Sequence, residues 1–362
     1  MTNALQAAHT TFELPAELSA AEPPEHRGLD RAGVRLLVAR PEGITHARFA
    51  DLTAFLAPGD LVVVNTSATL PAAVDGRRAD GSVVPVHFSA ELEDGAWIVE
   101  LRNPDGMGPL ADASRGEVIE LPDGVLLTLL AAHPDAGRRT GSRLWRTRVA
   151  ARLPVRSYLH RNGRPISYAY LRRQWPLTDY QTVFALESGS AEMPSAGRPF
   201  TDALVTDLVS HGVLIAPVLL HTGVSSLEAG EAPQAERYEV PAQTARLVRL
   251  TQAAGGRVIA VGTTVTRALE SAVSPDGVIQ ADAGWTDLVL GPQRPAQVVD
   301  GLITGWHAPQ ASHLLLLEAV AGPALVQEAY DAALEQRYLW HEFGDSALLL
   351  PKRNARELQR TA

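Results

Sequence analysis

Residues capable of proton transfer gather in a short segment of the second half of the sequence. The stretch 299–309 contains Asp300, Thr304 and His307, which we expect at the end of an apolar strand. A carboxylate and an imidazole at one such position supply a general acid and a general base. The same residues could instead cap a helix and satisfy a turn, so the pattern by itself leaves both interpretations open.

A second segment, 258–270, has the pattern of a buried strand, a glycine turn and a helix that begins with Thr263 and Thr264. A turn of this kind presents free backbone N–H groups and hydroxyls at the carboxyl edge of a sheet, where ligands bind. Arg267 and Glu270 follow one turn apart on the same helix. They could contact a ligand, or they could form an ordinary ion pair between neighbouring helical turns.

The composition is that of a globular protein and excludes several classes. The 362 residues are 46% hydrophobic and 20% charged, and no apolar run approaches the roughly 18–20 residues that a membrane span needs. There is no cysteine, which excludes disulfides, thiolate nucleophiles and cysteine-ligated zinc. The N-terminus has neither the basic nor the apolar region of a signal peptide, and we therefore expect a cytoplasmic protein.

The net charge of −9 argues against a nucleic-acid partner, but this charge is unevenly distributed. Residues 137–177 contain eleven arginines and no acidic residue, with aromatic residues interleaved. Arginines among aromatic side chains suit a surface for phosphates and bases, with Arg146, Arg148 and Arg152 as candidate contacts. The alternative is an ordinary solvated basic face, because arginine is the default cation of a chain with a single lysine.

The elements that must position these residues fall into two kinds. Short alternating runs separated by Gly, Asp and Pro dominate from about residue 72 to 150, which is typical of a small β-barrel or sandwich. After about residue 175 strands alternate with helices, which predicts a mostly parallel sheet with helices. We therefore predict an α/β domain formed by residues 1–72 and 152–362, with an all-β domain of residues 73–151 inserted into it.

These segments, in this order, resemble the S-adenosylmethionine:tRNA ribosyltransferase-isomerases of queuosine biosynthesis. The resemblance covers nearly the whole chain and is most specific at residues 180–184, 261–271, 284–287 and 298–307. It implies a barrel-like α/β domain with an inserted small β-barrel. It also implies that the ribosyl part of S-adenosylmethionine is transferred to the aminomethyl group of a 7-deazaguanine base in tRNA. The transferred ribosyl group then rearranges to an epoxycyclopentanediol, and adenine and methionine leave.

The implied reaction needs a base beside the sulfonium, an acid for the departing adenine and a carboxylate near the positive sulfur. The candidates for these catalytic roles are His307, Asp300, His221 and Glu270, although a histidine that ends an apolar run, as His221 does, is more often structural. The expected binding residues for S-adenosylmethionine are Thr263, Thr264, Arg267, Thr304, Tyr180 and Gln181. We expect no metal, a nucleoside-containing substrate, tRNA as the partner and a monomer.

Several positions depart from the pattern of the resembled family. This chain has Ala68 and Ala73 where the family has arginine, and Pro199, Glu231 and Gln234 where it has histidine. The loss of cationic and imidazole groups from a site lowers transition-state stabilisation. Two alternatives therefore stay open: an enzyme that uses a nucleoside-containing substrate on a different acceptor, and a non-catalytic binding protein with the same fold.

Overall fold

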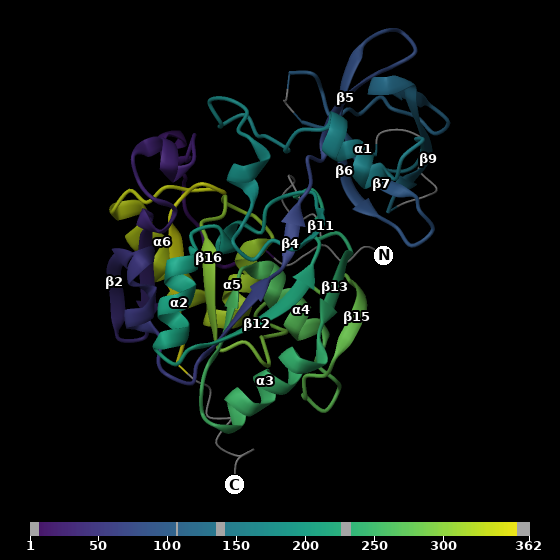
Figure 1. Ribbon diagram of the computed structural model, residues 1–362. Coiled ribbons are helices and arrows are strands. Elements are labelled where there is room, and N and C mark those ends of the chain that lie inside the picture. Colours follow the sequence, from purple (N-terminus) through teal and green to yellow (C-terminus); the bar gives the residue numbers. More distant parts are fainter. Residues whose placement is uncertain (1–6, 106–107, 135–141, 226–232, 353–362) are drawn as a thin grey trace.

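The computed structural model describes residues 7–105, 108–134, 142–225 and 233–352 (Figure 1). Its larger part is a nine-stranded mixed sheet packed between helices, and its smaller part is a closed six-stranded barrel. The chain starts in the large sheet, passes through the barrel and returns to complete the sheet. The predicted α/β fold with an inserted β-barrel is confirmed. Within the described residues, no helix is both long enough and apolar enough to span a membrane.

The large sheet has the strand order β15-β13-β12-β3-β14-β16-β17-β1-β2. Its centre, β12-β3-β14-β16, is parallel, whereas β2, β13, β15 and β17 each run antiparallel to a neighbour. The predicted mostly parallel sheet is therefore right for the centre only. Short connections such as the one between β1 and β2 can join only antiparallel strands, and apolar patterns do not show strand direction. The bounds are β1 Arg35–Arg40, β2 Gly43–Arg48, β3 Leu61–Asn65, β12 Leu214–Leu220, β13 Glu236–Val240, β14 Val258–Val261, β15 Asp282–Thr286, β16 Gly301–Gly305 and β17 Ser346–Leu349.

Both faces of this sheet are buried, which explains its continuous apolar strands. In β3, Leu61 and Val63 face a core shared with helices α3 to α6. Val62 and Val64 face a second core with α2 and the 3-10 helix η4. The helical bounds are η4 Phe49–Phe55, α2 Asp202–Ser210, α3 Ala242–Ala253, α4 Thr263–Ser271, α5 His313–Ala321 and α6 Pro323–Glu335.

The barrel closes in the order β10-β7-β6-β5-β8-β9 around its own core. Phe88, Trp97 and Trp145 fill this core and are almost fully buried. The short helix α1 (Val155–Asn162) follows the last barrel strand and adds Tyr158 and Leu159 to the same core. The barrel strands are β5 Ala73–Arg77, β6 Val83–Glu91, β7 Trp97–Leu101, β8 Val118–Leu121, β9 Val125–His133 and β10 Leu144–Ala150.

A two-stranded ribbon lies between the two parts, formed by β4 (Ser67–Thr69), which precedes the barrel strands in the chain, and β11 (Glu187–Ser190), which follows them. The two strands pair in parallel, and both are visible between the sheet and the barrel in Figure 1. Gln181 fastens the ribbon from the side. Its amide oxygen accepts the N–H of Thr69 at 3.0 Å, and its amide nitrogen donates to the Thr69 carbonyl at 2.8 Å.

Candidate active site

A pocket of about 360 Å³ opens at the carboxyl edge of the central parallel strands. Its lining comes from the chain after β12, β14 and β16, and from residues near 168, 192 and 342. Pockets of about 300–1,000 Å³ are the usual size for small-molecule sites. The carboxyl edge of the parallel strands is also where α/β sheets bind ligands. We therefore take this pocket as the candidate active site.

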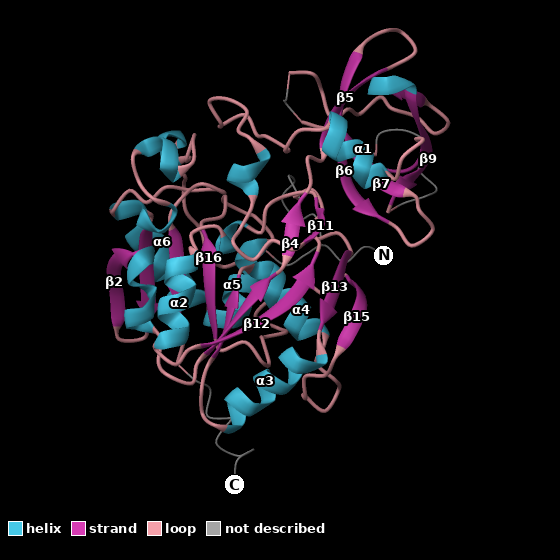
Figure 2. Cartoon of the chain, viewed as in Figure 1, coloured by secondary structure: helices cyan, strands magenta, loops and turns pink. Residues whose placement is uncertain are grey.

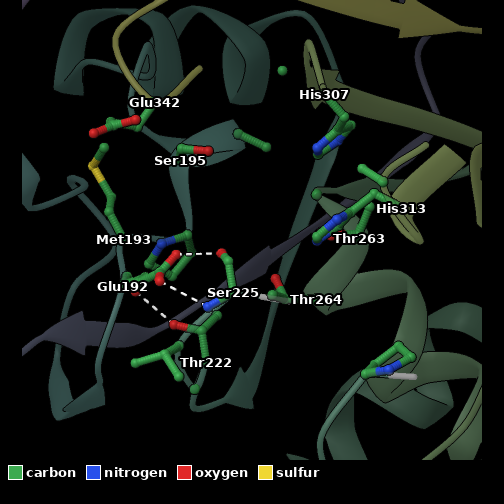
Figure 3. A pocket seen from close by; sticks show the side chains of 18 of the residues that line it. Glu192, Met193, Ser195, Thr222, Ser225, Thr263, Thr264, His307, His313 and Glu342 are labelled. Atoms are coloured by element: carbon green, nitrogen blue, oxygen red, sulfur yellow. Dashed lines mark hydrogen bonds between the residues drawn. The ribbon is translucent and has the colours of Figure 1, made fainter. Parts of the chain in front are cut away.

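One side of the pocket, the imidazole wall, consists of Thr263, Thr264, Thr304, His307 and His313. Figure 3 labels all of them except Thr304. The hydroxyl of Thr304 lies 3.1 Å from Nε2 of His307. The ring of His307 stacks on that of His313, with centroids 4.6 Å apart and planes inclined by 4°. Burial lowers the pKa of His307 well below its usual value and lowers the pKa of His313 to about 4. Both imidazoles are therefore neutral at pH 7.

The glycine turn before α4 brings the threonines of this wall into place. Gly262 has φ 92°, a left-handed value that favours glycine, and a Cβ atom there would lie 3.2 Å from Cβ of Ala196. Its N–H donates to the carbonyl of Ile303 at 2.8 Å, which ties the ends of β14 and β16 together. Thr263 and Thr264 follow directly and line the pocket, as the sequence predicts for a strand–turn–helix unit.

A second group of lining residues, the carboxylate wall, consists of Glu192, Glu342, Tyr168, Tyr170 and His341. Figure 3 shows its two glutamates across the pocket from His307 and His313. Glu192 accepts hydrogen bonds from the Tyr168 hydroxyl, from the backbone N–H of Ser225 at 2.8 Å and from the Ser225 hydroxyl at 2.5 Å. Glu342 accepts one from the Tyr170 hydroxyl. Burial raises the pKa of Glu342 to about 7.

The rings of the carboxylate wall form a ladder that orders its two tyrosines. Tyr168 and Tyr170 stack with centroids 5.9 Å apart, and Tyr170 stacks on His341 at 4.2 Å, each pair inclined by about 15°. Burial lowers the pKa of His341 to about 4, so this ring is also uncharged at pH 7. The hydroxyl of each tyrosine thus donates a hydrogen bond to one glutamate, while stacking holds its ring in place.

Between the walls, the side chain of Arg267 is fully engaged with the protein. Its guanidinium pairs with Glu236 and donates to the carbonyls of Thr286 at 2.9 Å and Leu288 at 3.2 Å. Glu236 also accepts the N–H of Gly223 at 2.9 Å. Burial raises the pKa of Glu236, and the charge of Arg267 opposes that rise. Arg267 lines the pocket as predicted, but its donors hold the floor of the site together.

The charge of the lining favours a cationic ligand. Three carboxylates (Glu192, Glu236 and Glu342) and one guanidinium (Arg267) line the pocket, while its imidazoles are neutral. A concave surface with an excess of one charge raises the local concentration of the opposite charge. Among the residues that the structure describes, no group of three or more acidic or imidazole side chains is placed to hold a metal ion.

Two of the predicted catalytic carboxylates do not lie in the pocket. Asp300 precedes β16, and its Oδ2 accepts the N–H of Val258 at 2.8 Å, at the opposite end of the strands from His307. The expectation that Asp300 lies beside His307 is wrong because residues 301–305 form a strand between them. Glu270 is also buried away from the pocket. Its carboxylate accepts backbone N–H groups of Gln297 at 2.8 Å, Val298 at 2.9 Å and Val299 at 3.0 Å.

His221 and Gln181 lie near the ribbon and do not line the pocket. His221 is 8% exposed, its Nδ1 lies 2.7 Å from the Ser67 hydroxyl, and burial lowers its pKa to about 4. Its ring packs so closely on Gly189 that a Cβ atom there would overlap it. Gln181 holds the backbone of β4, as described above. The predicted residues that do line the pocket are Tyr180, Thr263, Thr264, Arg267, Thr304 and His307.

The sequence interpretation missed the carboxylate wall. Tyr168 and Tyr170 were counted there only as aromatic residues of the arginine-rich stretch, but their hydroxyls bond to pocket glutamates. Glu192, Glu342 and His313 belong to no recognised motif. The available signal was the adjacent pair His341–Glu342, two polar titratable residues between the apolar residues of α6 and β17.

Most of the arginine-rich stretch is neutralised by nearby acidic residues. Arg146, one of the three predicted nucleic-acid contacts, is ion-paired with Asp94. Arg148 and Arg152 are exposed and have no salt bridge within the described part of the chain. The other pairs in the stretch are Arg143–Glu100, Arg156–Glu91, Arg161–Asp123, Arg164–Asp75 and Arg172–Glu22. Arg148 and Arg152 are therefore the better candidates for a contact with phosphates.

The positions that depart from the resembled family mostly lie outside the pocket lining. Ala68 in β4, Ala73 at the start of β5 and Pro199 are buried and do not line it. Gln234 does line the pocket, and Glu231 lies outside the described residues.

Fold and site together define an α/β protein with an inserted barrel and a pocket lined by more carboxylates than guanidinium groups. The family model described as "Queuosine biosynthesis protein" matches residues 7–349. The S-adenosylmethionine:tRNA ribosyltransferase-isomerase of Acidiphilium cryptum is 36% identical over 357 residues, which are 93% of this chain and 97% of that protein. The protein of the same name from Thermotoga maritima is 33% identical over 348 residues, with coverages of 94% and 98%.

A solved structure gives the same result. The crystal structure of an S-adenosylmethionine tRNA ribosyltransferase from Thermotoga maritima matches with a TM-score of 0.52 and 29% identity. The match covers 94% of this chain and 99% of that chain. The chain belongs to the family of queuosine biosynthesis proteins, and the resemblance seen in the sequence is confirmed.

Proposed function

We propose that this protein is a transferase-isomerase that acts on S-adenosylmethionine and tRNA. It transfers the ribosyl moiety of S-adenosylmethionine to a 7-aminomethyl-7-deazaguanine base in tRNA and isomerises it to an epoxycyclopentanediol. The similarity of its full-length relatives supports this proposal. The observation that carries it is the acidic pocket at the carboxyl edge of the sheet, because S-adenosylmethionine carries two positive groups and one carboxylate.

The proposed binding mode places the methionine carboxylate at the N-terminus of α4. The first backbone N–H groups of a helix and the hydroxyls of Thr263 and Thr264 are suitable donors for an anion there. Glu192, on the other side of the pocket, then stabilises the positive sulfur. The three hydrogen bonds that Glu192 accepts keep its carboxylate in a fixed position before the substrate binds.

We assign proton transfer beside the sulfonium to His307. Its imidazole is neutral at pH 7 because burial lowers its pKa, and it lies in the pocket on the end of β16. The Thr304 hydroxyl, 3.1 Å from Nε2, orients the ring. Arg267 acts through Glu236 and the backbone, as a group that fixes the floor of the pocket.

The remaining parts of the proposal concern the partner and the setting. The modified anticodon base of tRNA enters the pocket while Arg148 on the barrel strand β10 and Arg152, just after that strand, contact phosphates. The protein works as a monomer in the cytoplasm. Light scattering of the purified protein tests the oligomeric state, and a second species at twice the mass would contradict it.

The deciding experiment measures S-adenosylmethionine binding by calorimetry and adenine release in the presence of tRNA. Two tRNA samples are compared, one bearing the 7-aminomethyl-7-deazaguanine base and one bearing guanine at that position. Binding with adenine release only on the modified tRNA is the expected result. Binding without release points to a different acceptor, and the absence of binding contradicts the proposed substrate.

A further inference from the structure

Glu342 differs from the other two carboxylates of the pocket in how its oxygens are used. Glu236 lies between Arg267 and the N–H of Gly223, and both oxygens of Glu192 accept hydrogen bonds. Glu342 accepts a side-chain hydrogen bond only at Oε2, from Tyr170, within the described residues. The hydrogen bonds to this carboxylate thus come from one tyrosine hydroxyl and from its own backbone, which leaves it with capacity for a ligand in the pocket.

The turn that positions Glu342 contains a strained backbone conformation. His341 has φ 72°, a left-handed value that is strained for a residue other than glycine, and its carbonyl accepts the N–H of Gly344 at 3.0 Å. The same turn stacks the His341 ring on Tyr170 and directs Glu342 to the pocket. Strained non-glycine residues cluster at binding sites, where the surrounding structure fixes them.

The charged groups around Glu342 keep it in exchange between its two protonation states. Burial raises its pKa to about 7, and the negative charge of Glu192 acts in the same direction. The hydrogen bond from Tyr170, a hydrogen bond from the backbone of Glu342 itself and the positive charge of Arg198 oppose the rise. The other titratable groups that face it are His341, Tyr168 and Tyr180. At neutral pH the carboxylate can therefore both attract a cation and retain a proton.

The acceptor in the proposed function has a chemical requirement that this group meets. A primary aminomethyl group resembles the lysine side chain, whose pKa is near 10.4, and is an ammonium ion at neutral pH. An ammonium nitrogen has no lone pair and cannot form a new bond to carbon. It must lose a proton first, and a carboxylate within hydrogen-bond reach is the simplest acceptor.

Resting on the proposed function, we propose that Glu342 binds the aminomethyl group of the acceptor base and removes its proton. One N–H bond breaks, an O–H bond forms on the carboxylate, and the electron pair stays on the nitrogen. Figure 3 shows Glu342 across the pocket from His307 and His313, so the acceptor enters on the side away from the imidazole wall. Tyr170 is then a positioning residue for Glu342.

The first test replaces Glu342 and follows both substrates. Glu342→Gln should lower kcat/KM for the modified tRNA by about 10²–10⁴-fold, the usual contribution of a positioned base, and leave S-adenosylmethionine binding within about threefold of the wild type. Glu342→Asp keeps the charge and should retain more activity than Glu342→Gln. If Glu342→Gln instead abolishes S-adenosylmethionine binding, Glu342 contacts that substrate and the inference is wrong. If the wild type turns over and Glu342→Gln has the same tRNA kinetics, the inference alone is wrong. If the wild type itself shows no turnover, the proposed function fails and the inference fails with it.

The second test uses the two stacked tyrosines as a matched pair. The wild type should show an acidic limb in kcat/KM near pH 7, with activity rising as Glu342 ionises. Tyr170→Phe removes a hydrogen bond that favours the ionised form and should move this limb to higher pH. Tyr168→Phe removes the same hydroxyl from the adjacent ring, where it serves Glu192, and should leave the limb in place. Equal shifts in both variants, or no shift in Tyr170→Phe, would contradict the assignment.

Discussion

The two walls of the pocket are built in different ways. The imidazole wall comes from regular βα units, where the ends of β14 and β16 lead into α4 and toward α5. The carboxylate wall comes from chain that Figure 2 draws mostly as loop, and tyrosine hydroxyls hold its two glutamates. The position of the first wall is set by the backbone of the sheet. Hydrogen bonds to the glutamates and the stacked rings set the second. The second should therefore be the easier of the two to alter without unfolding the protein.

The largest expected effect comes from breaking the floor that joins the walls. Arg267→Met leaves Glu236 buried without its cation and removes donors to three backbone carbonyls. Breaking one partner of a buried pair costs about 3–5 kcal/mol of unfolding free energy. Urea denaturation measures the change. Arg237→Met, at the exposed neighbouring position on β13, is the matched control and should stay within about 0.5 kcal/mol of the wild type.

Substitutions in the imidazole wall should lower the rate of turnover more than the stability of the protein. His307→Asn removes the proposed proton acceptor and should lower the rate of adenine release by about 10²–10⁴-fold. Single-turnover assays with saturating S-adenosylmethionine measure this rate. His211→Asn, at the exposed end of α2, is the control with unchanged rate. A His307→Asn protein with wild-type turnover would remove this wall from the chemistry.

The neutral imidazoles also predict how stability depends on pH. Burial lowers the pKa of His313 from 6.5 to about 4 in the folded protein, so the unfolded chain binds the proton more readily. The stability that follows from this difference is complete above pH 6.5 and is lost as the pH falls toward 4. His313→Asn should therefore lose less stability on acidification, by at most about 1.4 kcal/mol per pH unit. Denaturation curves at pH 7, 6 and 5 compare the slopes, and identical slopes would show that His313 does not contribute.

The smallest expected effect is on tRNA binding, from arginines at the end of the barrel and just after it. Replacing both Arg148 and Arg152 with serine should reduce the salt dependence of tRNA binding, by roughly one unit of log–log slope per lost phosphate contact. Arg146→Ser should change it less, because Arg146 is already paired with Asp94. Affinity measurements between low and high salt test both. A larger effect from Arg146 than from the exposed pair would reverse this assignment.

The contrast between the walls also explains what the sequence could predict. The strand–glycine–threonine pattern at 258–264 indicates a regular unit, and it correctly places Thr263, Thr264 and Arg267 at the pocket. The carboxylate wall depends on contacts between residues far apart in the chain. Tyr168 meets Glu192 across 24 residues and Tyr170 meets Glu342 across 172. No local periodicity encodes such contacts.

The error at Asp300 has a related cause. An apolar run of three or four residues shows that a strand exists but leaves its start undefined by a few positions. A shift of that size moves a side chain from the end of a strand to its beginning, and with it to the far edge of the sheet. Glu270 illustrates a second limit. Its spacing from Arg267 suggested an ion pair, whereas its carboxylate accepts hydrogen bonds from the backbone N–H groups of Val298 and Val299.

The place of β17 in the sheet has a consequence for the order in which the protein folds. β17 lies between β16 and β1, and within the described structure the N-terminal hairpin β1–β2 reaches the rest of the sheet only through it. The hairpin is synthesised long before its neighbour, because β17 is the last strand of the described residues. Such distant pairing forms late and slowly. The early hairpin must therefore wait, with one edge unpaired, until synthesis has passed residue 349, and during that time it is exposed to chaperones and to aggregation.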